Sequence, residues 1–376
     1  MLENFKFICP YCQNDYLKDN VIRLCERADC KHYKEAIKPN IFGMYKQKCN
    51  CRGSITRCRC YECSQIIPRD ILDWPYIPFS IVGTTSSGKS SLITVMMDEF
   101  GYNGLGLTAH PLGETSEIQD THKEQVYYNR ERLMPTDPEA LTPTKMPEPQ
   151  IWKITNGGRK KSGFAPSYTF TIFDGAGEHS QGQSPENIVR YIGKSKAMIV
   201  TIDPLTINGI SKNIDIKVRN NTQRDRIVGG RPDAALANIT TLIRDSRHHI
   251  GLGRDLDIPV AVVLTKFDVI TTCNKFIDMF KKNAPILNPA PSVNDRKVDI
   301  VQMKNVSDDI VRLLEETREH NFVQTIKNNF KEKNVMFFGV SSYGRPPKDD
   351  GTLHEITPHK VLDPLLWLLK KMDFVD

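Results

Sequence analysis

The segment 83–90, GTTSSGKS, constrains the fold of this 376-residue chain more strongly than its composition does. It matches the pattern Gly-x4-Gly-Lys-Ser/Thr, in which glycines let successive backbone N–H groups curl around phosphate oxygens. The spacing places Lys89 to reach the β- and γ-phosphates and the Ser90 hydroxyl to coordinate Mg²⁺. A buried strand is expected before it at 78–82 and a helix after it at 91–100. The residues expected to contact a nucleotide are Gly83, Ser86, Ser87, Gly88, Lys89, Ser90 and Ser91.

Downstream of this loop, apolar strand-like runs alternate with segments of helical periodicity. Further strands are expected at 150–155, 168–173, 196–202, 258–264 and 335–340. Helices are expected at 184–193, 233–249, 307–330 and 361–372, with a polar helical stretch at 116–133. This alternation predicts an α/β fold with a mainly parallel sheet.

Nine of the ten cysteines precede residue 64 and indicate a separate metal-binding segment. In a reducing cytosol, such closely spaced thiols are expected to bind metal rather than form disulfides. Two closed structural zinc sites are favoured, with an iron–sulfur cluster or unligated redox thiols as alternatives. The first site is expected to use Cys9, Cys12, Cys25 and Cys30, with His32 as an alternative fourth ligand. The second is expected to draw four ligands from Cys49, Cys51, Cys58, Cys60 and Cys63, with Cys58 as the favoured spare.

Three parts of the chain are therefore expected. A zinc-ribbon domain at 1–66 holds too few aliphatic residues to fold well without metal. A short proline-containing linker at 67–77 is expected to bring this domain into contact with a nucleotide-binding domain at 78–376. Insertions in the larger domain are expected at about 101–150, 205–231 and 281–297. The latter two are interpreted either as disordered loops or as surfaces for a partner or for self-association.

The net charge of +6 is mild, and no run of 18 apolar residues is present. The N-terminus lacks an apolar signal core, so we expect a cytoplasmic chain.

A second phosphate-related element is Asp174-Gly-Ala-Gly177, at the end of the strand expected at 168–173. A carboxylate in this position holds Mg²⁺, usually through water. Gly177 is expected to give its backbone N–H to the γ-phosphate, because a side chain there would clash.

A third element, Thr265-Lys-Phe-Asp268, follows the strand expected at 258–264. The Asp268 carboxylate can accept hydrogen bonds from guanine N1–H and the 2-amino group together, a donor pair that adenine lacks. The Lys266 stem is expected to lie along the base. Ser341-Ser342-Tyr343 fits a loop whose backbone N–H groups contact guanine O6.

GTTSSGKS, DGAG, TKFD and SSY, in this order at successive strand ends, resemble the Ras-like GTPases of the TRAFAC class over about residues 77–376. The cysteine ribbon, the form DGAGE and the closing VLDPLLWLL are more closely similar to bacterial double-GTPase families of conflict and anti-phage systems. The resemblance implies a six-stranded sheet with one antiparallel pair, GTP and Mg²⁺ as ligands, and switch segments that move on hydrolysis.

The chain departs from the family where hydrolysis is concerned. Glu178 stands where Ras-like proteins often have a glutamine that orients water, and His179 is a second catalytic candidate beside Lys89. Slow intrinsic hydrolysis is expected, because no motif fixes an arginine near the γ-phosphate. The switch threonine that contacts Mg²⁺ is assigned to Thr144 or Thr142, with Thr136 as the alternative.

Two classes of function follow. The first is a GTP-hydrolysing switch that signals to a protein effector or a second GTPase. The second is a nucleic-acid-associated GTPase whose ribbon contacts RNA or DNA, an alternative suggested by Arg52, Arg57 and Arg59. A scaffold with an inactive nucleotide site is disfavoured, because Lys89, Ser90, Asp174 and Asp268 are all present.

Overall fold

The structure is a computed structural model of the whole chain. The residues that it describes are 6–17, 21–41, 46–68, 70–83, 86–102, 104–133, 149–159, 167–174, 191–222, 240–241, 243–245, 247–248 and 256–376.

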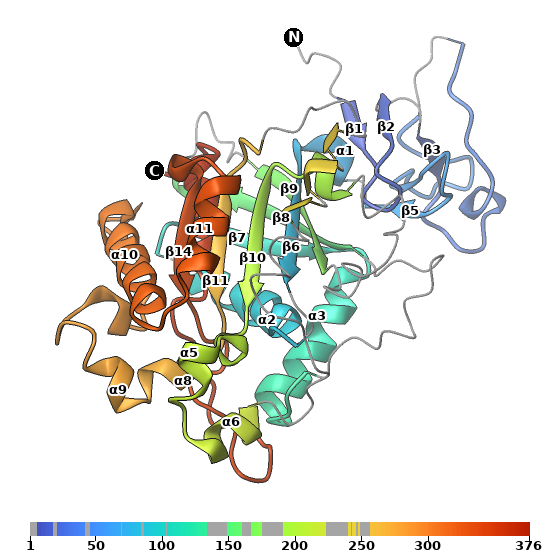
Figure 1. Cartoon of the computed structure of the whole chain (residues 1–376). Coiled ribbons are helices and arrows are strands. Elements are labelled where there is room, and N and C mark those ends of the chain that lie inside the picture. The colour runs from blue at the N-terminus through green and yellow to red at the C-terminus, as the bar shows by residue number, and fades with distance from the viewer. Residues whose placement is uncertain are drawn as a thin grey trace.

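A seven-stranded sheet forms the centre of the molecule, in the order β14-β11-β10-β6-β9-β8-β7 (Figure 1). Its strands are β6 (Tyr76–Gly83), β7 (Leu107–Leu112), β8 (Gln150–Asn156), β9 (Ser167–Asp174), β10 (Ala197–Ile202), β11 (Val260–Leu264) and β14 (Val335–Gly339). The five strands from β14 to β9 run parallel to one another. The predicted α/β fold with a mainly parallel sheet is thus confirmed.

The sheet differs from the expected six strands by one additional edge strand, β7, which lies within the insertion predicted at 101–150. β8 pairs antiparallel with β9, and β7 pairs antiparallel with β8, so there are two antiparallel pairs rather than one. Pro111 lies in β7, opposite Trp152. Proline cannot donate to a sheet ladder, and an edge strand tolerates it because only one side is paired.

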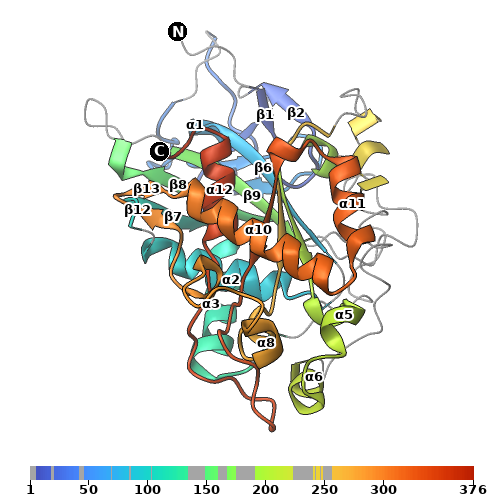
Figure 2. The same ribbon diagram turned by 60° about the vertical axis from the view of Figure 1, so that its left-hand side comes forward.

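Helices cover both faces of the sheet (Figures 1 and 2). One apolar layer joins the sheet to α10 (Ile300–Glu316) and α11 (His320–Asn329), and the other joins it to α2 (Lys89–Glu99) and α12 (Asp363–Lys371). Neighbouring residues of β10 divide between the layers, with Ile199 in one and Val200 in the other. This alternation is what a strand buried on both faces requires.

The remaining helices of the larger domain are short. They are α3 (Thr115–Lys123), α5 (Asn208–Ser211), α6 (Ile216–Thr222), α8 (Asp268–Thr271) and α9 (Asn274–Ile277). A π-helical turn at Glu124–Tyr128 continues α3, so a helical segment does lie within the polar stretch expected at 116–133. Most of the helices expected at 184–193 and 233–249 lies outside the described residues.

The single helix predicted at 307–330 is wrong in its extent. The chain forms α10 and α11 instead, because it turns at Arg318, whose φ is +66°. Both helices bury apolar residues in the same layer, so these residues keep helical spacing on either side of the break. The spacing alone therefore does not reveal where the chain turns.

The insertion predicted at 281–297 is an ordered part of the fold. It contains the two-residue strands β12 (Val293–Asn294) and β13 (Lys297–Val298), which lie beside the start of α10 in Figure 2. The buried Lys360 ammonium donates to Ala290 O at 3.0 Å and to Ser292 Oγ at 3.1 Å, and Asp363 accepts from the Ser292 N–H at 2.7 Å. Of the two interpretations considered, a disordered loop is therefore excluded for this segment.

The cysteine-rich module (blue in Figure 1) lies against one side of the sheet. It consists of β1 (Lys6–Ile8), β2 (Asp15–Leu17), β3 (Ile22–Leu24), β4 (Arg57–Arg59) and β5 (Ile66–Ile67). The linker forms one helical turn, α1 (Asp70–Asp73), and Lys153 of β8 holds it through an ion pair of 2.8 Å with Asp70. The expected contact between module and sheet is therefore present.

Candidate functional site

The phosphate-loop sequence lies between β6, which ends at Gly83, and α2, which begins at Lys89. A Cβ on Gly83 would overlap both the side chain and the carbonyl oxygen of Thr201 on β10, so only glycine fits there. Gly88 has φ of +80°, which strains any residue with a side chain. These two glycines therefore bring the loop close to β10 and turn it into the helix. Thr84 and Thr85 lie outside the described residues.

Two serines of the loop differ in their surroundings. The Ser87 hydroxyl is fully buried and lies 2.8 Å from Thr201 Oγ1, so it anchors the loop to β10. Ser86 has φ of +59°, and its buried hydroxyl has no hydrogen-bond partner in the described part of the chain. A buried hydroxyl without a partner is costly. An acceptor such as a phosphate oxygen would relieve that cost.

Lys89 and Ser90 occupy the first turn of α2. The Lys89 side chain is buried, and its ammonium donates to the Gly83 carbonyl at 3.4 Å, so it folds back over the loop. Ser90 is half-buried. The N-terminal end of α2 therefore presents a cation and a hydroxyl at the place where the sequence predicts phosphates and Mg²⁺.

The TKFD segment is tied directly to the phosphate loop. Thr265 Oγ1 donates to the Ser87 carbonyl at 2.7 Å, and Lys266 Nζ donates to the Ser86 carbonyl at 2.9 Å. Lys266 also forms an ion pair of 2.8 Å with the buried carboxylate of Asp203. Two motifs separated by about 180 residues are thus joined by direct hydrogen bonds.

Sequence reasoning missed Asp203, which lies just beyond the end of β10. Its other oxygen accepts from the Leu205 N–H at 2.9 Å, so the carboxylate is fixed from both sides. The adjacent position of β10 and β11 in the sheet was the signal that could have identified it.

Asp268 begins α8 at the same edge of the sheet. Its carboxylate accepts from Ser341 Oγ at 2.5 Å, and the Ser341 hydroxyl accepts in turn from the Gly344 N–H at 2.8 Å. Burial raises the pKa of Asp268, and the Ser341 hydrogen bond opposes that rise. Ser341 therefore holds the Asp268 carboxylate in one orientation and favours its ionised form.

The SSY loop reaches back to the phosphate-loop helix. Tyr343 Oη lies 2.7 Å from Ser91 Oγ, a contact that the sequence does not reveal, and burial raises the pKa of this phenol. Gly344 is required next to it, because a Cβ there would overlap the Thr357 backbone. Ser342, between these contacts, is half-buried.

The other predicted site residues are not gathered by the described structure. Asp174 ends β9, where its backbone pairs with Ile81 of β6, but its side chain lies outside the description. Five further residues lie outside the described residues, namely Thr142, Thr144, Gly177, Glu178 and His179, as does the alternative Thr136.

Two four-cysteine clusters lie in the N-terminal module, and the expected division of ligands between them is wrong. The first, here named the inner cysteine site, combines Cys9, Cys12, Cys60 and Cys63. The second, the outer cysteine site, combines Cys25, Cys30, Cys49 and Cys51. The first and last knuckles of the segment come together, and the outer site is formed by the chain between them. Cys58 and His32 belong to neither cluster.

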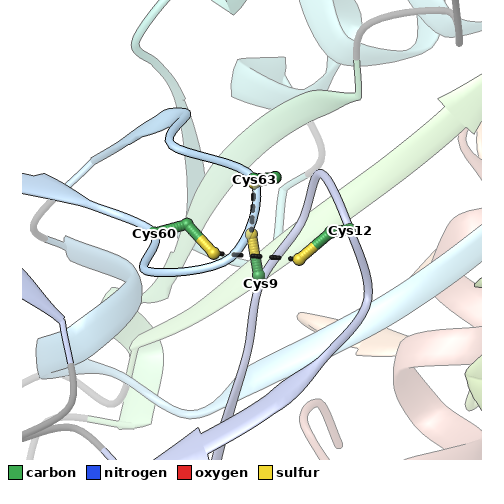
Figure 3. Close-up of side chains that lie close together, drawn as sticks. All are labelled: Cys9, Cys12, Cys60 and Cys63. Atoms are coloured by element: carbon green, nitrogen blue, oxygen red, sulfur yellow. Dashed lines mark hydrogen bonds between the residues drawn. The ribbon is translucent and has the colours of Figure 1, made fainter.

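The inner cysteine site is built from two knuckles of matching geometry (Figure 3). The N–H of Cys9 donates to Asn14 O at 3.0 Å, and that of Cys60 to Gln65 O at 2.9 Å. The residue after each knuckle, Gln13 or Ser64, has φ near +58°. Because each knuckle closes a hairpin, β1–β2 or β4–β5, pairing of the two hairpin tips brings four thiols together.

The outer cysteine site has a different frame. Cys49 N–H donates to Gly53 O at 2.8 Å, and a Cβ on Gly53 would lie 2.8 Å from Cys25 Sγ. A hydrogen bond from the Gly53 backbone lowers the pKa of Cys51 to about 7, which favours a thiolate ligand.

Both clusters fit a tetrahedral metal ion. The Cys12–Cys60 and Cys9–Cys63 sulfur pairs are 3.7 and 3.8 Å apart, and the outer pairs Cys25–Cys51 and Cys30–Cys49 are 3.4 and 3.8 Å apart. A tetrahedral ion with bonds of about 2.3 Å to sulfur separates its ligands by roughly 3.8 Å. Disulfide sulfurs lie at about 2.05 Å, so these thiols are not bonded to one another.

The surroundings of the two clusters also differ. The inner thiols pack in one apolar cluster with Ile151 of β8, Tyr76 of β6 and Leu112 of β7. Among the described residues, the apolar side chains that pack with the outer thiols are Ile37 and Ile55 of their own module. Among the described helices, none is long and apolar enough to cross a bilayer.

No protein-family model matches the chain, and no curated protein matches it. Among solved structures, it is similar to the GTP-bound GTPase-like domain of Saccharomyces cerevisiae Ski7, with 13% identity, a TM-score of 0.32 and coverage of 71% of this chain and 43% of that one. It is also similar to the bacterial selenocysteine-specific elongation factor EF-Sec, with 12% identity, a TM-score of 0.25 and coverage of 72% and 26%. It is also similar to Sup35 complexed with GDP, with 10% identity, a TM-score of 0.26 and coverage of 72% of this chain and 38% of that one. The matched region spans less than half of each of these chains, and the function proposed below is argued from this chain's own residues.

Proposed function

We propose that this chain binds GTP and GDP with Mg²⁺ and hydrolyses GTP slowly, acting as a Ras-like molecular switch. The observation that carries the proposal is a pair of hydrogen bonds, one from Thr265 to the Ser87 carbonyl and one from Lys266 to the Ser86 carbonyl. They join the loop that ends at Ser90 to the segment that carries Asp268, which supports a phosphate-binding role for the first and a base-reading role for the second. Ligands of open α/β sheets bind at the carboxyl ends of strands.

Each end of a guanine nucleotide has a matching group in this proposal. Backbone N–H groups of the phosphate loop, the α2 N-terminus and Lys89 bind the phosphates, and Ser90, Asp174 and Thr144 or Thr142 hold Mg²⁺. Asp268, oriented by Ser341, accepts from guanine N1–H and the 2-amino group. Glu178, with His179 as the alternative, orients water. Arg224, Arg226 or Arg231 of the basic insertion could supply an arginine to the γ-phosphate.

We place the switch in a signalling setting. Its partner is a protein effector or a second GTPase, as in the bacterial double-GTPase families of anti-phage systems that the sequence resembles. Zinc is the proposed ion at both cysteine sites, because four thiolates at tetrahedral spacing make a closed structural zinc site.

Nucleotide choice tests the proposal. Calorimetry is expected to show binding of Mg-GTP and no measurable binding of Mg-ATP at equal concentration. Asp268→Asn should weaken GTP and favour xanthosine triphosphate, because an amide can donate to the 2-oxo group of xanthine. Asp308→Asn, an exposed change on α10, is the matched control and should leave both affinities unchanged. Equal affinity of the unchanged protein for ATP and GTP would overturn the assignment.

A further inference from the structure

The excess positive charge of the chain is concentrated around the outer cysteine site. Residues 21–57 contain nine Lys or Arg and three Asp or Glu, an excess of six that equals the net charge of the entire chain. The rest of the molecule is therefore balanced. Four thiolates with one Zn²⁺ subtract about two charges, which leaves the segment clearly cationic.

Two of the three acidic residues in this segment are already engaged. The Glu26 carboxylate accepts from the Ser54 N–H at 2.9 Å, and these hydrogen bonds lower its pKa. Asp29 pairs with Arg27 at 2.5 Å, which lowers the pKa of that carboxyl. In the described part of the chain, neither acid neutralises the neighbouring lysines.

Besides Arg27, which is paired with Asp29, six cationic side chains of this segment are solvent-exposed. They are Lys31, Lys34, Lys38, Lys46, Lys48 and Arg52, here named the outer cationic surface. Lys31, Lys48 and Arg52 each follow or precede a ligand of the outer cysteine site directly in sequence. The four sulfurs lie within 4.8 Å of one another, and adjacent Cα atoms are about 3.8 Å apart. These three cationic residues therefore lie around one compact cysteine site.

Aromatic groups accompany the charge. The Arg57 guanidinium lies 3.7 Å from the centre of the Tyr33 ring and donates to Tyr33 O at 3.0 Å, so both are held in place. Tyr61 lies in the Cys60–Cys63 knuckle, at the end of β4 away from Cys25, and is 69% exposed. An exposed ring on the same module as a cationic surface offers a stacking platform for an unpaired base of a strand long enough to reach both.

We propose that the outer cationic surface binds single-stranded nucleic acid, with Lys31, Lys48 and Arg52 on the phosphates and Tyr61 stacked on a base. The inner cysteine site occupies the side of the module that packs on the sheet, so this surface is left to solvent. Phosphates at regular spacing match a set of separate point charges, and the exposed tyrosine favours nucleic acid over an acidic protein or a membrane.

The test measures the salt dependence of binding to a 20-nucleotide single-stranded RNA by fluorescence anisotropy. Each phosphate contact contributes about −0.7 to the slope of log K against log salt for single strands. The variant Lys31→Gln/Lys48→Gln/Arg52→Gln should reduce the magnitude of the slope by about 2. The matched variant Lys281→Gln/Lys282→Gln/Arg296→Gln removes the same charge from exposed positions of the larger domain and should keep the slope of the unchanged protein.

Base stacking is tested separately. Tyr61→Ala should weaken the binding of single-stranded RNA by roughly five- to a hundredfold, because stacking on one base is worth about 1–3 kcal/mol. The same variant should bind duplex RNA as tightly as the unchanged protein. Equal losses in the two triple variants, or no loss on Tyr61→Ala, would overturn the proposal. Polyglutamate or phosphatidylserine vesicles binding as tightly as RNA would do the same, in favour of an acidic protein or a membrane.

The proposal is independent of the nucleotide site. Every variant should retain two zinc ions and the GTP affinity of the unchanged protein, both measured on the same preparation. Loss of RNA binding with GTP affinity intact supports the surface. If GTP does not bind but RNA does, the proposed GTPase function fails and the surface stands.

Discussion

The inner and outer cysteine sites offer a metal the same four thiols, yet they have different neighbours. The inner site is part of an apolar cluster that includes Ile151, Tyr76 and Leu112 of the large sheet. In the part of the chain that the structure describes, the outer site packs against apolar residues of its own module and has exposed cationic neighbours. Two clusters with the same four ligands therefore differ in their setting, because one packs against the large sheet and the other packs within its own module.

The largest effect expected from this difference is on removal of an inner ligand. Cys60→Ser should lose about one zinc per chain and destabilise the large domain by roughly 4 kcal/mol or more, because Ile151, Tyr76 and Leu112 of the sheet lose the apolar packing of the module. Calorimetric unfolding with elemental analysis measures both changes. An unchanged nucleotide-domain transition after loss of that zinc would show that the join contributes no stability.

Removing an apolar contact from the sheet side should have the next largest effect. Ile151 is 1% exposed, and Ile151→Ala should cost about 2–5 kcal/mol in the free energy of nucleotide-domain unfolding. Ile55→Ala, in the cluster of the outer site, is the matched control and should leave that transition unchanged. Similar losses from both changes would mean that the two clusters are coupled.

Acid should act on the large domain at His359, whose backbone pairs with that of Ser341. Burial beside Lys360 lowers the pKa of His359 to about 4, so the folded state resists a proton that the unfolded state accepts below about pH 6.5. Stability is therefore complete above pH 6.5 and falls by roughly 3 kcal/mol as the pH drops to 4. The difference between the unchanged protein and His359→Gln in chemical unfolding from pH 7.5 to 4.5 isolates this effect from acid release of zinc. Parallel curves would contradict it.

The smallest effect on the nucleotide domain is expected from the outer site. Cys49→Ser should lose about one zinc but change the unfolding free energy of the nucleotide domain by less than about 0.5 kcal/mol, as for distant independent sites. Mg-GTP affinity should also stay the same. A loss comparable to that of Cys60→Ser would remove the distinction between the two sites.

The sequence predicted best what depends on local spacing. Gly83, Gly88 and Lys89 are fixed relative to one another by a short motif, and the structure places them between a strand and a helix. Contacts between distant segments were not predictable in this way. Asp203 and Tyr343 were missed as contact residues because their partners, Lys266 and Ser91, are neighbours only in the folded sheet.

The incorrect predictions have related causes. The seventh strand was missed because Pro111 makes its sequence atypical of a strand, although an edge strand accepts it. The cysteines were divided by order along the chain, whereas matching hairpin tips bring the first knuckle to the last. Ligand spacing identifies how many sites are present, but hairpin pairing decides which ligands share one.

In the sequence, the four ligands of the outer site lie between the two ligand pairs of the inner site, and this order affects which site binds metal first. Cys30 and Cys49 are 19 residues apart, whereas Cys12 and Cys60 are 48 apart. Closing the longer loop costs about 0.8 kcal/mol more in chain entropy, and a filled outer site shortens it. The newly synthesised chain should therefore take its first ion at the outer site. Under zinc starvation, the species that accumulates would have a folded outer cysteine site, while the inner site would remain open and unpacked against the large sheet.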